Sequence, residues 1–281
     1  MKIGISTFVT GYSIHPAVLA QRVEALGFES FWVPEHPIIP VQTTTPFPGS
    51  ADGIIPDHYA KWLDPFATLA TAAAVTKTLK IGTGICLVPE RNPLHLAKEV
   101  ATVDYLSGGR FSLGIGAGWL KEETEIFGAN YARRWSWTRE CILALKELWT
   151  KDEAEFHGEF IHFPAVKSFP KPVQKPHPPV ILGGMAKNVF KRTVEYGDGW
   201  LPNRVTPDQV KAGRAELDHL ALEAGRDPAS IEISVFGQPP DPDLIKRFED
   251  AGAARVMVRV MALPEREALT ELEAIAKKVL Q

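Results

Sequence analysis

The chain is poor in cysteine: only Cys86 and Cys141 occur among its 281 residues. Both stand in apolar runs, where a small buried thiol is expected. This count excludes a disulfide-stapled secreted scaffold and favours a reducing compartment. The N-terminal segment lacks the charged region, apolar stretch and cleavage site of a signal peptide, so we expect a cytoplasmic protein.

Long apolar runs and an excess of one charge are also missing. No window holds about 18 consecutive apolar residues, so no membrane span is expected. Thirty-one Lys and Arg oppose thirty-four Asp and Glu, for a net charge of −3, and no basic run could follow a phosphate backbone. Nucleic acid is therefore not an expected partner. The remaining composition is that of a globular domain, which excludes disordered and collagen-like chains.

Several well-known catalytic signatures are absent as well. The chain has no Gly-x-Ser-x-Gly elbow, no His-Glu-x-x-His and no Cys-x-x-Cys. No His-x-His pair occurs on a strand, which argues against a metal hydrolase barrel. His157 and His162 could clip a metal across a hairpin, but they lack a third ligand nearby, so solvated surface histidines and no metal site are expected.

Short β-branched runs alternate eight times with amphipathic segments. Parallel strands joined by helices close into a barrel at eight units, so we predict an α/β fold: a single (β/α)8 TIM barrel spanning residues 1–281. An open doubly wound sheet is the alternative. The expected strands are Lys2–Phe8, Ser30–Pro34, Lys80–Leu87, Arg110–Ile115, Pro179–Leu182, Gly199–Pro202, Ile231–Phe236 and Ala254–Val258.

Two stretches exceed what a barrel of about 250 residues needs. Residues 37–62, after the second strand, are rich in proline and far longer than an ordinary loop of about 2–6 residues. Residues 151–177, after the fourth strand, could fold back as a hairpin about Gly158. We interpret both as insertions in one barrel, where the carboxyl ends of the strands build the active site.

Glycine is what the predicted strand ends share. Gly114 to Gly118 superficially matches a dinucleotide fingerprint, but Trp119 stands where its last glycine belongs. Gly183 and Gly184 precede a helix expected from Lys187, so their N–H groups are expected to be free for an anion. Glycines that only turn the chain are the alternative, although three glycine pairs on one rim favour a cofactor.

The order and spacing of several segments resemble the bacterial luciferase-like superfamily of flavin- and deazaflavin-dependent oxidoreductases, especially its coenzyme F-420-dependent group. The resemblance spans nearly the whole chain. It is carried by Glu35-His36, Asp64-Pro65, Ile81 to Pro89, Arg91-Asn92-Pro93, Leu106 to Arg110, Gly114 to Trp119, Phe169 to Gln174, Gly183-Gly184 and Gly197 to Pro202.

The resemblance implies a tricyclic cofactor in the barrel mouth, with its phosphate near Gly183 and Gly184. It also implies a cis peptide bond at Gly84–Ile85 beneath the ring. Arginines at the start of a helix, Arg133, Arg134 and Arg139, match positions near the cofactor tail, with a solvated helix start as the alternative. The expected cofactor-binding residues are Thr7, Thr83, Gly84, Ile85, Cys86, Gly116, Gly118, Trp119, Arg139, Gly183, Gly184 and Met185.

His36 matches a histidine near the reactive edge of the cofactor in several family branches. An imidazole with a pKa near 6.5 can donate a proton to the atom that receives a hydride. Glu35 could orient it or face outward; we predict both as catalytic. The expected substrate-binding residues are Phe8, Asp57, His58, Tyr59 and Asn203.

The favoured function is hydride transfer to or from a small organic substrate with coenzyme F-420. The alternative is an FMN-dependent monooxygenase that uses oxygen and FMN reduced by a separate reductase. A non-redox barrel lyase or isomerase, and a catalytically silent flavin-binding barrel, also remain open. Family members are often dimers, so a homodimer is expected.

Overall fold

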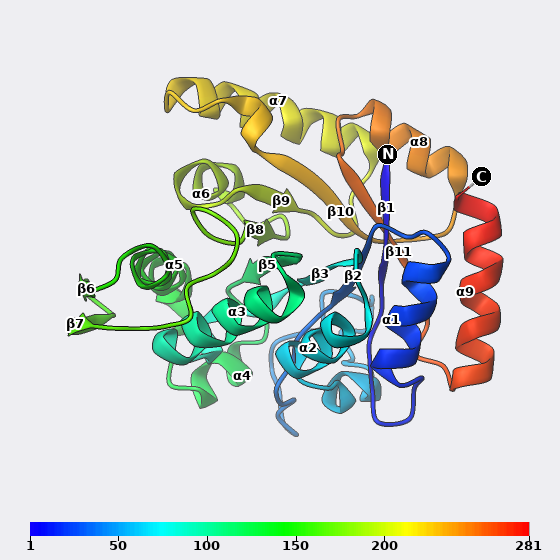
Figure 1. The fold of residues 1–281 in the computed structure, drawn as a ribbon, viewed down its shortest axis with the longest axis horizontal. Helices are drawn as coiled ribbons and strands as arrows, with labels where there is room; N and C mark the ends of the chain where they lie inside the picture. Colours follow the sequence, from blue (N-terminus) through cyan, green and yellow to red (C-terminus); the bar gives the residue numbers. More distant parts are fainter. Residues whose placement is uncertain (281) are drawn as a thin grey trace.

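The computed structural model describes residues 1–280, and eight parallel strands close a barrel within them (Figure 1). The strands follow the order β3-β2-β1-β11-β10-β9-β8-β5, and the pairing of β3 with β5 closes the ring. The predicted eight-stranded barrel is confirmed. The strands are β1 (Lys2–Ser6), β2 (Ser30–Val33), β3 (Lys80–Thr83), β5 (Phe111–Gly116), β8 (Val180–Gly183), β9 (Gly199–Leu201), β10 (Glu232–Gln238) and β11 (Arg255–Arg259).

A helix follows each barrel strand and packs on the outside of the ring (Figure 1). Both faces of each strand are thereby buried, which is why β2 and β5 are buried along their whole length. The helices are α1 (Pro16–Ala25), α2 (Pro65–Val75), α3 (Pro93–Ser107), α5 (Arg134–Thr150), α6 (Val189–Tyr196), α7 (Pro207–Glu223), α8 (Pro242–Asp250) and α9 (Glu265–Val279).

Local sequence sets the start of several helices. A polar residue followed by proline recurs at Asp64, Asn92, Thr206 and Asp241, and each polar side chain accepts a hydrogen bond from a backbone N–H of the first turn. Proline suits the first helical position because its missing N–H would have no partner there. These caps fix where the chain turns from a strand end into the outer layer.

The third predicted strand is interrupted. It runs as β3 to Thr83, and after Gly84 and Ile85 the chain resumes as the short β4 (Cys86–Leu87), which pairs with β5. The chain then continues through a 3-10 turn at Val88–Glu90 into α3. The interruption places Ile85 at the mouth of the barrel rather than in the ladder.

The two long stretches differ in structure. The segment between β2 and α2 holds one 3-10 helix, Asp57–Lys61, and contacts the loop between β1 and α1 through a bridge between Thr10 and Trp62. The later stretch contains the predicted hairpin, β6 (Ala154–His157) and β7 (His162–Val166), at the edge of the molecule beside α5 (Figure 1). A short helix, α4 (Lys121–Ile126), follows β5, and further 3-10 turns occur at Tyr131–Arg133 and Pro228–Ser230.

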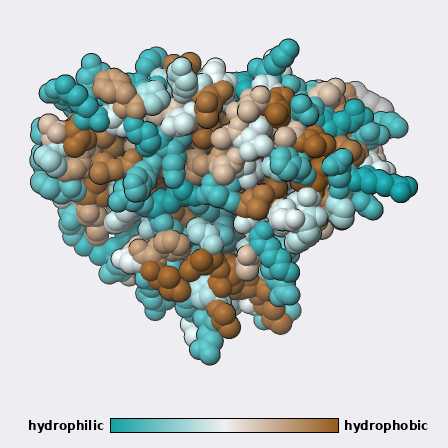
Figure 2. Space-filling view, turned by 60° about the horizontal axis from the view of Figure 1, so that its bottom comes forward, coloured by the Kyte–Doolittle hydropathy of each residue, from teal (hydrophilic) through white to brown (hydrophobic). Residues whose placement is uncertain are grey.

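The outer surface mixes residue types. Figure 2 shows separate groups of hydrophobic side chains among hydrophilic ones on the face that it draws. Among residues 1–280, no helix combines the length and the apolar character that crossing a bilayer requires.

Candidate functional site

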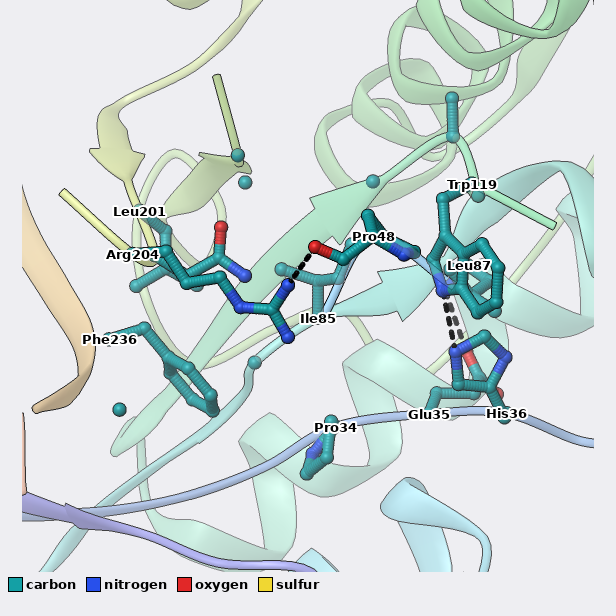
Figure 3. Close-up of a pocket in the computed structure, with 18 of the residues that line it drawn as sticks. Pro34, Glu35, His36, Pro48, Ile85, Leu87, Trp119, Leu201, Arg204 and Phe236 are labelled. Atoms are coloured by element: carbon teal, nitrogen blue, oxygen red, sulfur yellow. Dashed lines mark hydrogen bonds between the residues drawn. The ribbon is translucent and has the colours of Figure 1, made fainter. Parts of the chain in front are cut away.

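A cavity of about 410 Å³ opens at the carboxyl ends of the barrel strands, within the size range of cofactor and small-molecule pockets. Its wall comes from the strand ends and from the segment between β2 and α2 (Figure 3). The structure therefore gathers most of the predicted site residues. Those that line the cavity are Thr7, Phe8, Glu35, His36, Tyr59, Gly84, Ile85, Gly116, Gly118, Trp119, Gly183, Gly184, Met185 and Asn203.

The Gly84–Ile85 peptide bond is cis, as the resemblance implies. Ile85 projects toward two neighbouring strand ends. A Cβ built on Gly116 would lie 1.9 Å from Ile85 Cδ1, and one on Gly183 would lie 2.6 Å from Ile85 Cγ2. The Ile85 side chain occupies the space that a Cβ at either position would enter, and at Gly183 the Ile115 carbonyl oxygen would also lie 3.0 Å from that Cβ. Close approach of a phosphate to Gly183 is not needed to explain its identity.

The Gly183-Gly184 turn also differs from the prediction at its N–H groups. Gly184 adopts a φ of +82°, which favours glycine, and its N–H donates to Leu201 O over 3.0 Å. Helix α6 begins at Val189, two residues later than expected. The prediction of a free amide at Gly184 is therefore wrong. Met185 and Ala186, which follow in the chain, line the cavity, and within residues 1–280 their amides have no acceptor.

The centre of the cavity is apolar. Ile85, Leu201 and Phe236 form this surface (Figure 3), and it rests on buried Trp32 and Met257. A flat aromatic ring that packs on this surface would bury apolar area without leaving polar groups unpaired. With the open amides of Met185 and Ala186 on one side, the cavity fits a planar ring system that carries an anionic tail.

His36 stands in a chain of three hydrogen-bonded side chains. Its Nδ1 lies 2.6 Å from Glu123 Oε2, and the indole Nε1 of Trp119 donates to His36 Nε2 over 3.1 Å (Figure 3). An indole nitrogen can only donate, so Nε2 carries no hydrogen and the ring proton sits on Nδ1. Nδ1–H therefore donates to Glu123. The unprotonated Nε2 accepts the hydrogen bond from the Trp119 indole at the cavity wall.

Burial sets the charge of this pair. It lowers the pKa of His36 to about 4 and raises the pKa of Glu123 to about 8. The side chains are 5% and 1% exposed, respectively. Both groups therefore favour their neutral forms at pH 7, and Glu123 Oε1, which has no hydrogen-bond partner among residues 1–280, is left to carry a proton. The pair is equipped to hold one exchangeable proton beside the cavity.

Glu35 does not orient His36. Its Oε2 accepts the Leu87 N–H over 2.7 Å, and its Oε1 accepts from the Arg91 guanidinium, with the Nε contact at 2.8 Å. Arg91 also pairs with Asp64 and Glu99. The structure assigns Glu35 to this network behind the cavity wall, which corrects its predicted alternative role of orienting the histidine; Glu123 takes that position instead.

A third acidic side chain, Glu90, is buried nearby. Its Oε1 accepts from Thr124 over 3.3 Å, and Oε2 has no partner within the described chain. Burial raises the pKa of Glu90 to about 9, and the neighbouring Glu123 and Glu35 add to that shift. Glu90 therefore keeps its proton in the folded protein well above the pH at which the unfolded chain loses it.

This elevated pKa predicts a pH-dependent stability. Because the folded state binds the Glu90 proton more tightly, stability falls as pH rises from about 4.5 towards about 9. Glu90→Gln is expected to stabilise the protein by on the order of 1–3 kcal/mol at pH 8 and to change little at pH 5. Urea unfolding at both pH values measures this. Glu125→Gln, at an exposed position, is the control, and equal pH sensitivity of Glu90→Gln and wild type would contradict the assignment.

Aromatic side chains build one side of the cavity. Phe8 stacks on Trp62 with ring centroids 4.6 Å apart, and the Tyr59 ring lies 4.4 Å from Trp62 and 5.5 Å from His36. His58 packs on Phe8 at 5.4 Å. The segment between β2 and α2 thus supplies an aromatic wall next to the Nε2 of His36.

Five predicted site residues do not line the cavity. Thr83 is buried and donates to Gly114 O, Cys86 is buried in the core, Asp57 is exposed, and His58 lies behind Phe8 and Tyr59. Arg139 is exposed and pairs with Glu195 on α6. The prediction of Arg139 as a cofactor ligand is not supported by this placement; Arg134, five residues earlier on another face of α5, lines the cavity instead.

Sequence reasoning missed several residues of the site. Glu123 lies in a run of charged residues typical of a solvated helix start, and nothing in the local sequence marked it as buried. Arg259 ends β11, one residue beyond the predicted strand end, and Arg204 directly follows Asn203. Functional residues were expected at the carboxyl ends of the strands, and a search one residue further along the chain would have found both arginines.

A closed barrel with an apolar cavity at the carboxyl ends of its strands, and a buried histidine at the cavity wall, has the architecture of a barrel enzyme. The sequence comparison is specific: a family model described as luciferase-like monooxygenase matches residues 15–239. The chain belongs to the luciferase-like monooxygenase family.

Related proteins span both cofactor classes. An uncharacterized protein of Mycobacterium tuberculosis is 37% identical over 99% of both chains. An FMNH(2)-dependent dimethylsulfone monooxygenase of Pseudomonas putida is 29% identical over 70% of this chain and 52% of its own. A coenzyme F-420-dependent tetrahydromethanopterin reductase from Methanopyrus kandleri shares the fold, with a TM-score of 0.75 at 18% identity over 99% of this chain and 98% of that chain.

Proposed function

We propose that the protein is an oxidoreductase that uses coenzyme F-420 for hydride transfer to or from a small organic substrate in the barrel cavity. The observation that carries the proposal is the neutral His36, held by Glu123 and Trp119 with a basic Nε2 beside an apolar bed. Oxidation of an alcohol, or reduction of a carbonyl, moves one hydride and one proton. The bound deazaflavin supplies the hydride chemistry, and the chain must handle the proton.

His36 and Glu123 suit that task. Nε2 has one lone pair, so the Trp119 N–H must first turn away from it; Nε2 then accepts a proton from a substrate hydroxyl, or returns it, while Nδ1–H stays bonded to Glu123. Loss of the Glu123 proton would place a carboxylate next to the imidazolium and stabilise it. The wall formed by Phe8, Tyr59 and Trp62 limits access of water to this nitrogen.

The remaining cavity residues have binding roles in the proposal. Ile85, Leu201 and Phe236 support the ring. Arg134, whose Nε and Nη1 bond only to the carbonyls of Gly118 and Tyr131, has its charge available for the anionic part of the cofactor, together with the amides of Met185 and Ala186.

An FMN-dependent monooxygenase is the alternative, favoured by the similarity to the dimethylsulfone monooxygenase. It would require reduced FMN from a separate reductase. We also propose a homodimer in the cytoplasm; the buried, unpaired thiols of Cys86 and Cys141 are compatible with a reducing compartment.

A titration with both cofactors tests the proposal. We expect F-420 to perturb the protein fluorescence and its own absorption at saturable concentrations, with a lower Kd than FMN. Arg134→Gln is expected to weaken binding about tenfold, because one charge-assisted contact is lost. Arg139→Gln, outside the cavity, is the matched control. Tighter binding of FMN would support the monooxygenase, and absence of binding by both cofactors would reject the redox function.

A further inference from the structure

Most of the charged side chains that line the cavity are arginines that form no ion pair with a carboxylate. The lining includes Arg134, Arg204 and Arg259 but a single carboxylate, Glu35, which is already paired with Arg91. Within residues 1–280 none of the three cavity arginines has an ion-pair partner. A guanidinium that faces a small-molecule cavity without a carboxylate is a ready partner for an anionic ligand.

Two of these arginines follow barrel strands, Arg204 after β9 and Arg259 at the end of β11, whereas Arg134 begins α5. Arg204 Nη1 donates to Pro48 O over 2.5 Å, and its guanidinium extends across the cavity (Figure 3). Arg259 Nη2 donates to Gly237 O over 3.0 Å. Each has made one hydrogen bond to a backbone carbonyl, which leaves other N–H donors and the whole charge for a ligand.

The two arginines follow strands on either side of β10. Arg204 comes after β9 and packs on Phe47 at 5.5 Å, and the Phe47 ring lies 5.0 Å from Tyr59. Arg259 ends β11 and is bonded to Gly237 of β10. The Tyr59 ring in turn lies 5.5 Å from the His36 ring. An anion held by the two arginines would thus lie on the same aromatic side of the cavity as His36.

We propose that Arg204 and Arg259 form a subsite for a carboxylate of the substrate, so that the enzyme acts on a small carboxylate-bearing molecule whose reacting carbon faces His36. Calling the bound anion a substrate rests on the proposed function. The anion site itself depends only on the two arginines. Arg204 also packs on Phe47 at 5.5 Å, so a bound carboxylate would be coupled to the segment that covers the cavity.

The test measures binding and needs no turnover. Benzoate and its neutral isostere benzamide are titrated against the wild type by calorimetry or tryptophan fluorescence. Benzoate is expected to bind about tenfold or more tightly, because its carboxylate forms charge-assisted hydrogen bonds with the guanidinium groups and the neutral amide does not. Arg204→Gln and Arg259→Gln should each remove most of that preference and leave benzamide binding unchanged. Arg139→Gln, outside the cavity, should behave as the wild type.

A second arm separates the two sources of an anion, substrate and cofactor. Affinities for FMN and riboflavin, which differ only by the phosphate, are compared in the same variants. If Arg204→Gln and Arg259→Gln reduce the preference for FMN over riboflavin and spare benzoate, the arginines hold the cofactor phosphate and the substrate subsite is overturned. Equal binding of benzoate and benzamide, or no saturable binding of benzoate, also overturns it. Retained benzoate discrimination with no binding of F-420 or FMN would reject the redox function but keep the anion site.

Discussion

His36→Ala is expected to lower turnover by roughly 10²–10⁴-fold while cofactor affinity stays near that of the wild type. The His36 imidazole lines the cavity beside the aromatic wall, and its removal leaves the ring bed of Ile85, Leu201 and Phe236 intact. Stopped-flow measurement of substrate-dependent change in cofactor absorption gives the rate, and titration gives the affinity. His219→Ala, on the exposed face of α7, is the control.

Substitution of Glu123, the hydrogen-bond partner of His36, distinguishes a role in proton transfer from a role in packing. Glu123→Gln can still accept the Nδ1–H bond but cannot ionise, so we expect a smaller loss of turnover and a changed pH–rate profile. Adding Glu123→Gln to His36→Ala should cost little more, because the two residues act as one unit. An unaltered pH profile in Glu123→Gln, or full activity of His36→Ala, would remove the pair from the mechanism.

Much of the barrel follows from local sequence. Strands buried on both faces appear as short apolar runs, and polar residues before proline mark where α2, α3, α7 and α8 begin. The strand-end rule then points to His36, Gly116 and Gly183. These positions could be predicted because each depends on a periodicity or on a residue type with a known backbone preference.

The partners within the site could not be predicted in this way. Glu35 and Glu123 are both close in sequence to other site residues, and only the fold shows that Glu35 turns to Arg91 while Glu123 reaches His36, 87 residues away. The space beside Gly183 is filled by the Ile85 side chain and the Ile115 carbonyl, which are contacts between neighbouring strand ends. Such choices depend on side-chain directions across the barrel mouth, which a linear pattern does not contain.

The network behind the cavity wall carries the largest expected effect on stability. Arg91→Met is expected to lower the free energy of unfolding by about 3–5 kcal/mol, because it leaves the Glu35 carboxylate, only 2% exposed, without its buried partner. Urea unfolding measures the loss. Arg139→Met removes an arginine that also pairs with a glutamate but is 47% exposed, and it should cost under about 1 kcal/mol.

A second substitution distinguishes the buried charge from lost packing. Adding Glu35→Gln to Arg91→Met should recover part of the stability, since an amide still accepts the Leu87 N–H but carries no charge. If packing of Arg91 on Phe66, at 4.6 Å, were the main contribution, the double variant would be no more stable than Arg91→Met. A loss in Arg91→Met no larger than in Arg139→Met would show that Glu35 does not depend on this ion pair. That result would instead favour a direct role of Glu35 in the cavity that it lines, as the sequence predicted.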